Sequence, residues 1–237
     1  MRLPNTASTG LSIFDYEKTI DYRIFIPMMD NTISVFDITG KQIKGWMFSK
    51  TDSPVKSPIQ HFVIDKKDYL IFNDKNTVYI LNRRGEIRVK VKENFQKSYN
   101  MFYIDKFPKT NAPCFVCTDI EGKLKYISTE GEVQTVTIDN FSNSHYFQSD
   151  DIDNDGGNDY IFADNKTLTV FNTNKKKIYS YSISQPISEN PVIYTFSSTD
   201  KKIGIVDSKT SELYLINPDG SIYKGFPLKG NTKFPIL

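Results

Sequence analysis

Short apolar runs separated by polar turns recur along the whole chain. Five segments share one pattern, an apolar and aromatic run that ends in a polar turn: residues 33–40, 79–85, 124–131, 168–175 and 213–220. The turn position is occupied in order by Gly40, Gly85, Gly131, Lys175 and Gly220, so successive copies are 45, 46, 44 and 45 residues apart. This constant spacing predicts five copies of one structural unit.

Each copy contains four apolar runs, which we interpret as strands. In the second copy they are residues 62–64, 69–72, 78–81 and 87–91, and in the fifth copy 192–194, 203–206, 213–216 and 221–223. The inner runs are continuously apolar, as in strands buried on both faces, whereas the last run alternates like an outer strand. The glycines predict a left-handed residue that closes each hairpin, so Lys175 must adopt that conformation without glycine's freedom or form a different turn.

Four strands in a repeat of about 45 residues are typical of a propeller blade. We therefore predict an all-β fold, a β-propeller or propeller segment of five four-stranded blades in a single domain or arc over residues 1–237. The predicted blades are residues 11–49, 55–95, 99–139, 145–184 and 190–229, with 230–237 as the start of a further blade. A closed five-bladed ring and an arc of a larger ring both fit, and we favour the arc because the terminal copies resemble the internal ones.

Composition narrows the classes of partner. Lys and Arg number 30 against 28 Asp and Glu, and a net charge of +2 does not predict nucleic-acid binding. Aromatic residues make up 14% of the chain, which favours strands. No apolar run approaches the roughly 18 residues of a membrane helix, so we expect no transmembrane segment in this chain.

Cys114 and Cys117 lie in a predicted strand and point to opposite faces, which indicates small buried residues rather than a disulfide or a zinc site.

The stretch 151–159 is rich in carboxylates. Asp151, Asp153, Asp155 and Asp159 stand at positions 1, 3, 5 and 9, and the carbonyl of Gly157 falls at position 7. Calcium takes six to eight oxygen ligands, and alternate side chains of a tight loop converge to supply them. These five residues therefore predict one structural Ca²⁺ site, for which a solvated acidic turn is the alternative.

The acidic stretch is an insertion into one copy of the repeat. It lies between the first and second predicted strands of the fourth copy, where the second copy has only residues 65–68. An EF-hand is excluded, because Phe162 stands where the bidentate Glu would be and no helices flank the loop. The ion would brace the fourth blade by joining carboxylates that otherwise repel one another.

The loop followed by an apolar strand resembles the calcium loop of FG-GAP/VCBS-type propeller repeats. The segments 44–46 (Lys-Gly-Trp) and 223–227 (Tyr-Lys-Gly-Phe-Pro) are similar to the Gly-Trp/Phe-Pro ending of those blades. More closely, the chain resembles the C-terminal propeller region of large uncharacterised bacterial proteins with an upstream domain of unknown function. This resemblance implies an extracytoplasmic protein, in the periplasm, cell envelope or secreted, provided that a signal lies upstream; it implies no known activity.

Catalytic residues are not evident in the sequence. His61 and His145 each begin a predicted first strand, and two histidines cannot by themselves build a three-ligand zinc site. We therefore predict a non-enzymatic binding or scaffold module of a bacterial envelope or secreted protein, with an unknown protein or glycan partner. Two alternatives stay open: a propeller that binds glycans through exposed aromatic residues, and a hydrolase or lyase in which channel-side carboxylates converge with His61 or His145.

Overall fold

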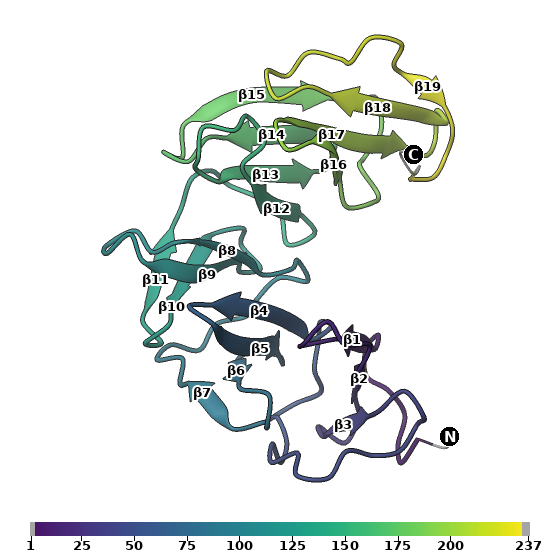
Figure 1. Ribbon diagram of the computed structural model, residues 1–237. Helices are drawn as coiled ribbons and strands as arrows, with labels where there is room; N and C mark the ends of the chain where they lie inside the picture. The colour runs from purple at the N-terminus through teal and green to yellow at the C-terminus, as the bar shows by residue number, and fades with distance from the viewer. Residues whose placement is uncertain (1–2, 234–237) are drawn as a thin grey trace. The chain divides into compact units, whose positions relative to one another are not determined.

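The computed structural model describes residues 3–233, and these residues form strands joined by turns and loops without any helix (Figure 1). They divide into two compact units. The first unit runs to Asp119 and includes Leu124–Val136, and the second comprises Ile120–Lys123 and the chain from Thr137 onward. Residues 234–237, part of the predicted start of a further blade, lie outside the described residues. Whether the blades close into a ring stays a prediction.

The first unit contains three antiparallel sheets whose strands follow one another in chain order. The first sheet consists of β1 (Ser12–Phe14), β2 (Arg23–Pro27) and β3 (Ile33–Phe36). The second sheet consists of β4 (Gln60–Ile64), β5 (Lys67–Asn73), β6 (Val78–Leu81) and β7 (Ile87–Val89). The third sheet consists of β8 (Tyr103–Lys106), β9 (Pro113–Thr118), β10 (Leu124–Ser128) and β11 (Val133–Val136).

The second unit contains two four-stranded antiparallel sheets, again in chain order. The fourth sheet consists of β12 (Tyr146–Asp150), β13 (Asp159–Asp164), β14 (Thr167–Phe171) and β15 (Lys177–Ser182). The fifth sheet consists of β16 (Val192–Ser197), β17 (Asp200–Asp207), β18 (Glu212–Ile216) and β19 (Leu228–Lys229). Consecutive up-and-down sheets of this kind confirm the predicted all-β, propeller-type fold.

The outer edge is shorter in the first and fifth sheets than the sequence pattern predicts. In the first sheet a single bridge joins Phe36 to Gln42, and in the fifth a single bridge stands at residues 216 and 222, where a strand over 221–223 was expected. In both sheets a left-handed glycine follows soon after the bridge, Gly45 (φ 87°) in the first and Gly225 (φ 94°) in the fifth, and the outer segment is interrupted there. In the fifth sheet the chain pairs with β18 again at β19. The glycines of the Gly-Trp and Gly-Phe endings thus share the left-handed conformation.

The hairpin turns behave as predicted in all five copies. The left-handed residues have φ values between 64° and 86° and are Gly40, Gly85, Gly131, Lys175 and Gly220. The N–H of each donates to the carbonyl three residues earlier, as from Gly85 to Asn82 at 3.0 Å and from Lys175 to Asn172 at 2.7 Å. Lys175 therefore adopts the conformation that glycine adopts elsewhere.

Apolar side chains pack between consecutive sheets inside each unit. Phe25 and Val35 of the first sheet pack with Leu70 and Phe72 of the second, and one further cluster joins the second sheet to the third. In the second unit, residues of β13 and β14 pack with residues of β17 and β18. The middle strands are buried almost throughout, as the continuous apolar runs predict.

The two cysteines lie in β9, where both are buried. This agrees with the prediction that they are small buried residues. Within residues 3–233 no helix is long and apolar enough to cross a membrane.

Candidate metal centre

The acidic loop joins the first two strands of the fourth sheet. The last residue pair of β12 and β13 is Asp150 with Asp159, so residues 151–158 lie outside the ladder. In the second sheet the last pair is Ile64 with Lys67, and only residues 65 and 66 form the turn. A two-residue turn is therefore sufficient at this position of the fold, and the longer loop needs another explanation.

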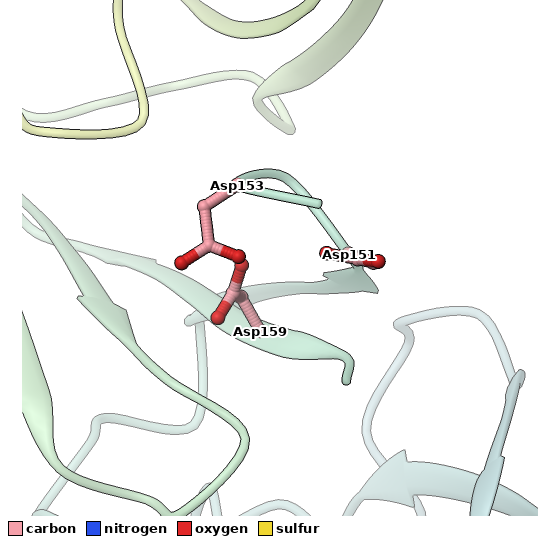
Figure 2. A group of neighbouring side chains, drawn as sticks. All are labelled: Asp151, Asp153 and Asp159. Carbon is pink, nitrogen blue, oxygen red and sulfur yellow. The ribbon is translucent and has the colours of Figure 1, made fainter. Parts of the chain in front are cut away.

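Three of the predicted ligands come together in this loop. The carboxylates of Asp151, Asp153 and Asp159 each offer an oxygen within 4.8 Å of the others. Figure 2 shows Asp153 reaching from the loop toward Asp159 at the start of β13, and Asp151 stands where the loop begins, directly after β12. Oxygen atoms at this separation are close enough to share one hard cation such as Ca²⁺.

Backbone N–H groups of the loop hold the carboxylates in place. Asp151 accepts hydrogen bonds from the N–H groups of Asp155 (3.1 Å) and Gly156 (3.0 Å). Asp159 Oδ2 accepts from the N–H of Ile152 at 3.1 Å, and the Ile152 side chain is fully buried in the core. The loop is thus anchored near its start, and its carboxylates are oriented before any ion binds.

Asp159 has the least compensated charge of the group. The residue is fully buried, and its Oδ1 has no hydrogen-bond partner. Burial, together with the negative charges of Asp153, Asp155 and Asp151, raises the pKa of Asp159 to about 7, although the hydrogen bond from Ile152 opposes this. A buried carboxylate oxygen without a donor is unfavourable, and a cation at this point would satisfy it.

The two other predicted ligands, Asp155 and Gly157, make contacts of their own. The Asp155 carboxylate accepts a hydrogen bond from the Gly157 N–H at 2.8 Å and does not belong to the three-carboxylate cluster. A Cβ at Gly157 would lie 2.6 Å from the Thr173 side chain, so the loop needs glycine there to pack on the β14–β15 turn. Asp155 and the Gly157 carbonyl as ligands stay predictions.

The loop also contacts the fifth sheet, which sequence reasoning missed. Lys201 Nζ donates to Asp150 Oδ1 and to the Asp151 carbonyl, both at 2.9 Å. The Asn154 side chain donates to the Thr199 carbonyl at 2.9 Å. Thr199 and Lys201 belong to the β16–β17 hairpin, about one repeat away in sequence, so no local signal could have predicted these contacts.

The histidines do not join the acidic cluster. His61 Nε2 lies 2.7 Å from Asp68 Oδ1 in the second sheet. His145, which is buried, has its Nδ1 2.6 Å from the Ser142 carbonyl in the second unit. Each ring has a local hydrogen-bond partner, and the two histidines lie in different units.

No family model and no curated protein matches the chain. Among solved structures, BBS1N in complex with ARL6DN, soaked with lead, matches with a TM-score of 0.60 and 11% identity, covering 92% of this chain and 66% of that one. The Vibrio cholerae biofilm matrix protein Bap1 matches with a TM-score of 0.58 and 12% identity, covering 92% of this chain and 38% of that one.

The chain thus spans just under two thirds of the BBS1N chain and well under half of Bap1. Identities of 11% and 12% bear on the fold alone. Together with the five consecutive antiparallel sheets, these likenesses support a fold of the propeller type.

Proposed function

We propose that this chain is a non-enzymatic binding module, a propeller-type scaffold of a bacterial envelope or secreted protein that engages a protein partner. Two observations support this proposal. BBS1N, which has a similar fold, was crystallised in complex with another protein, ARL6DN, and Bap1 is a biofilm matrix protein. The sheets of each unit are packed through continuous apolar cores, and such packing suits a rigid scaffold.

One structural Ca²⁺ belongs to this proposal, in the loop between β12 and β13. Asp151, Asp153 and Asp159 supply carboxylate oxygens, and Asp155 and the Gly157 carbonyl complete the set. The observation that carries the proposal is the fully buried Asp159: its Oδ1 lacks a hydrogen-bond partner, and its carboxylate offers an oxygen within 4.8 Å of oxygens from two further carboxylates. A divalent cation converts this repulsion into a cross-link.

The ion acts on stability rather than on a reaction. By neutralising the carboxylates it fixes the loop, and the loop is bonded to the fifth sheet through Lys201 and Asn154. Calcium would therefore brace two neighbouring sheets of the second unit, not only the β12–β13 connection. Binding to the folded state alone raises stability by about 2.7 kcal/mol when free calcium is a hundredfold above Kd.

The proposal also extends to FG-GAP/VCBS-type repeats and to an extracytoplasmic location. Its support is the position of the acidic loop between the first two strands of a sheet and the left-handed glycine shared by the two Gly-aromatic endings. Sites of modest affinity fill at the millimolar calcium levels found outside the cytoplasm but not at cytosolic levels. A calcium Kd far below the micromolar range would remove this argument for the location.

Isothermal titration calorimetry with CaCl₂ tests the metal site. The purified chain should bind one Ca²⁺, and Asp153→Asn should abolish the heat while leaving the far-ultraviolet spectrum unchanged, because Asp153 is exposed. Asp65→Asn is the matched control: Asp65 is an exposed carboxylate in the corresponding turn of the second sheet. Equal heats from the chain and Asp153→Asn would refute the proposed site.

A further inference from the structure

A pocket of about 320 Å³ opens between the first and second sheets of the first unit. Five segments build it: the loop after β1, strand β2, strand β3, the chain that follows the first sheet, and the β6–β7 turn. Its volume is at the lower end of the range for small-molecule sites, large enough for a single sugar ring. The acidic loop takes no part in it, so the inference below is independent of the calcium site.

Two buried donors in the pocket lining lack acceptors. The hydroxyl of Tyr16 and the indole N–H of Trp46 are buried without a hydrogen-bond partner, and both residues line the pocket. Burial raises the pKa of Tyr16 well above its ordinary value, so its hydroxyl stays protonated and able to donate. Leaving a buried donor unpaired costs about 1–3 kcal/mol, a cost that a ligand oxygen would offset.

The side chains that line the pocket carry more positive charges than negative charges. Four cations line the pocket, namely Arg23, Lys44, Arg83 and Arg84, against the two carboxylates of Glu17 and Asp21. Arg23 is paired with Asp21, and Arg83 is paired with Glu17. Within residues 3–233 neither Arg84 nor Lys44 forms a side-chain hydrogen bond or an ion pair. Two cations are therefore available to an anion.

The wall that carries Arg83 is fixed by its neighbours. Arg83 Nε lies 2.7 Å from Asp68 Oδ2, and the other oxygen of Asp68 lies 2.7 Å from His61. The guanidinium also stacks over the Tyr16 ring at 4.5 Å, and His61 meets the same ring edge-on at 4.9 Å. This network orients Tyr16 and Arg83, so the site is built before a ligand arrives.

We propose that this pocket binds an acidic sugar, a pyranose ring that bears one carboxylate. The carboxylate would pair with Arg84 and Lys44, and hydroxyl oxygens would accept hydrogen bonds from Tyr16 and Trp46. Other hydroxyl groups would donate to Glu17 and Asp21, and the C–H face of the ring would contact the apolar part of the lining: Phe25, Val35, Ile43 and Trp46. A phosphate dianion fits less well, because the two carboxylates would repel it.

Tryptophan fluorescence provides a direct test, because Trp46 is the only tryptophan of the chain and lines the pocket. Titration of the full chain with sodium D-glucuronate or D-galacturonate should give a saturable change in emission. D-Glucose, sodium acetate and inorganic phosphate, at the same ionic strength, should give none. Tri-galacturonate distinguishes a glycan from a free sugar as the source, since a glycan ligand predicts tighter binding of the trimer.

Variants then assign the response to the proposed contacts. Arg84→Ala should weaken glucuronate binding at least about tenfold, the effect of losing one charge-assisted hydrogen bond. Tyr16→Phe, which removes only the donor, should weaken it about threefold to tenfold. Arg88→Ala is the matched control, an exposed arginine of the same hairpin outside this pocket, and should bind like the unmodified chain. Thermal melting confirms that each variant is folded.

Several outcomes would overturn the proposal. They are the absence of a saturable response to either uronate, an equal response to acetate or glucose, tighter binding of phosphate, and unchanged uronate binding in a folded Arg84→Ala variant. Acetate binding as tight as that of glucuronate would mean a general carboxylate site without recognition of the sugar ring.

Discussion

The second and fourth sheets each carry a buried or half-buried carboxylate near the start of their second strand. The pKa of one carboxylate is lowered by its neighbours, and the pKa of the other is raised. Asp68 in β5 lies 2.7 Å from both His61 and Arg83. Burial favours its neutral form, but these two hydrogen bonds outweigh burial and lower the pKa of Asp68. Within residues 3–233 no cation is paired with Asp159 in β13, and burial beside three further carboxylates raises its pKa to about 7.

The second and fourth sheets share the hairpins of the repeat and differ in the residue at one position of the β-turn. The turn position that holds Arg83 in the second sheet, two residues before Gly85, holds Thr173 in the fourth, two residues before Lys175. Thr173 contacts Gly157 of the acidic loop instead of neutralising a carboxylate. The fourth sheet therefore keeps the hairpins of the unit, and because Asp159 has no cationic partner within residues 3–233, an external Ca²⁺ would supply one.

The largest expected effect comes from Asp159→Asn. Its effect on the free energy of unfolding should change sign when calcium is added. Without calcium the substitution removes a buried, uncompensated charge and should raise the free energy of unfolding by about 2–3 kcal/mol. With saturating calcium it should lower stability relative to the unmodified chain by a similar amount, because a ligand is lost. Thermal melts in EDTA and in excess CaCl₂ measure both effects, with Asp65→Asn as the control. A destabilisation of equal size in both buffers would indicate a purely structural role.

Gly85→Ala should be nearly as damaging in the second sheet. A Cβ at Gly85 would lie 2.8 Å from the Phe48 backbone nitrogen and 2.9 Å from the Trp46 ring, and φ is 83°. We expect a loss of about 2–3 kcal/mol in unfolding free energy, measured by urea denaturation. Gly10→Ala is a suitable control, since no atom lies within 4 Å of the added Cβ there. A neutral Gly85→Ala would mean that the turn is not constrained as described.

Arg83→Gln removes the cation that distinguishes the second sheet. We expect a loss of about 1 kcal/mol at pH 7, kept small because Arg83 is partly exposed. The pKa of Asp68 in the fold is below its ordinary value of 3.8, so its ion pairs contribute stability above that pH and lose it as the pH falls through the lowered pKa. The deficit of the variant should therefore shrink in acid, as followed by urea denaturation between pH 7 and pH 3. A constant deficit would assign the effect to packing of the arginine stem.

Lys175→Gly should have the smallest effect on stability, and it should stabilise the chain, whereas Gly85→Ala and Arg83→Gln should destabilise it. Lys175 has a φ of 64°, a conformation that glycine adopts at lower cost. We expect a gain of up to about 1 kcal/mol, reduced by the loss of the contact that Lys175 Nζ makes over the Tyr160 ring. Differential scanning calorimetry beside Lys176→Gly, at the exposed next position, separates the turn from a general effect of glycine. A lower melting temperature would show that the lysine side chain matters more than the backbone.

The sequence predicts the local parts of this structure well. Strand positions in the second copy and the left-handed residues of all five hairpins follow from alternation and turn chemistry, which act over a few residues. It also places Asp151, Asp153 and Asp159 together, because alternate side chains of a short loop converge.

Contacts between distant segments could not be predicted in this way. The hydrogen bonds that join the acidic loop to Lys201 and to the Thr199 carbonyl, and the pocket around Trp46, depend on how separate copies pack. The shortened outer edges of the first and fifth sheets likewise depend on where a left-handed glycine redirects the chain, at Gly45 and Gly225. The alternation of apolar residues alone does not predict where the chain is redirected.

Hydrogen–deuterium exchange of the chain with and without calcium tests the central claim most directly, because it reports each copy of the unit separately. Calcium should slow amide exchange in residues 151–160 and, through Asn154 and Lys201, in the β16–β17 hairpin at residues 197–201. Residues 60–70 of the second sheet, where Asp68 already has its cation, should exchange at the same rate in both samples. Unchanged exchange in residues 151–160, or equal protection in residues 60–70, would contradict the account of a calcium brace that acts on the fourth and fifth sheets and not on the second.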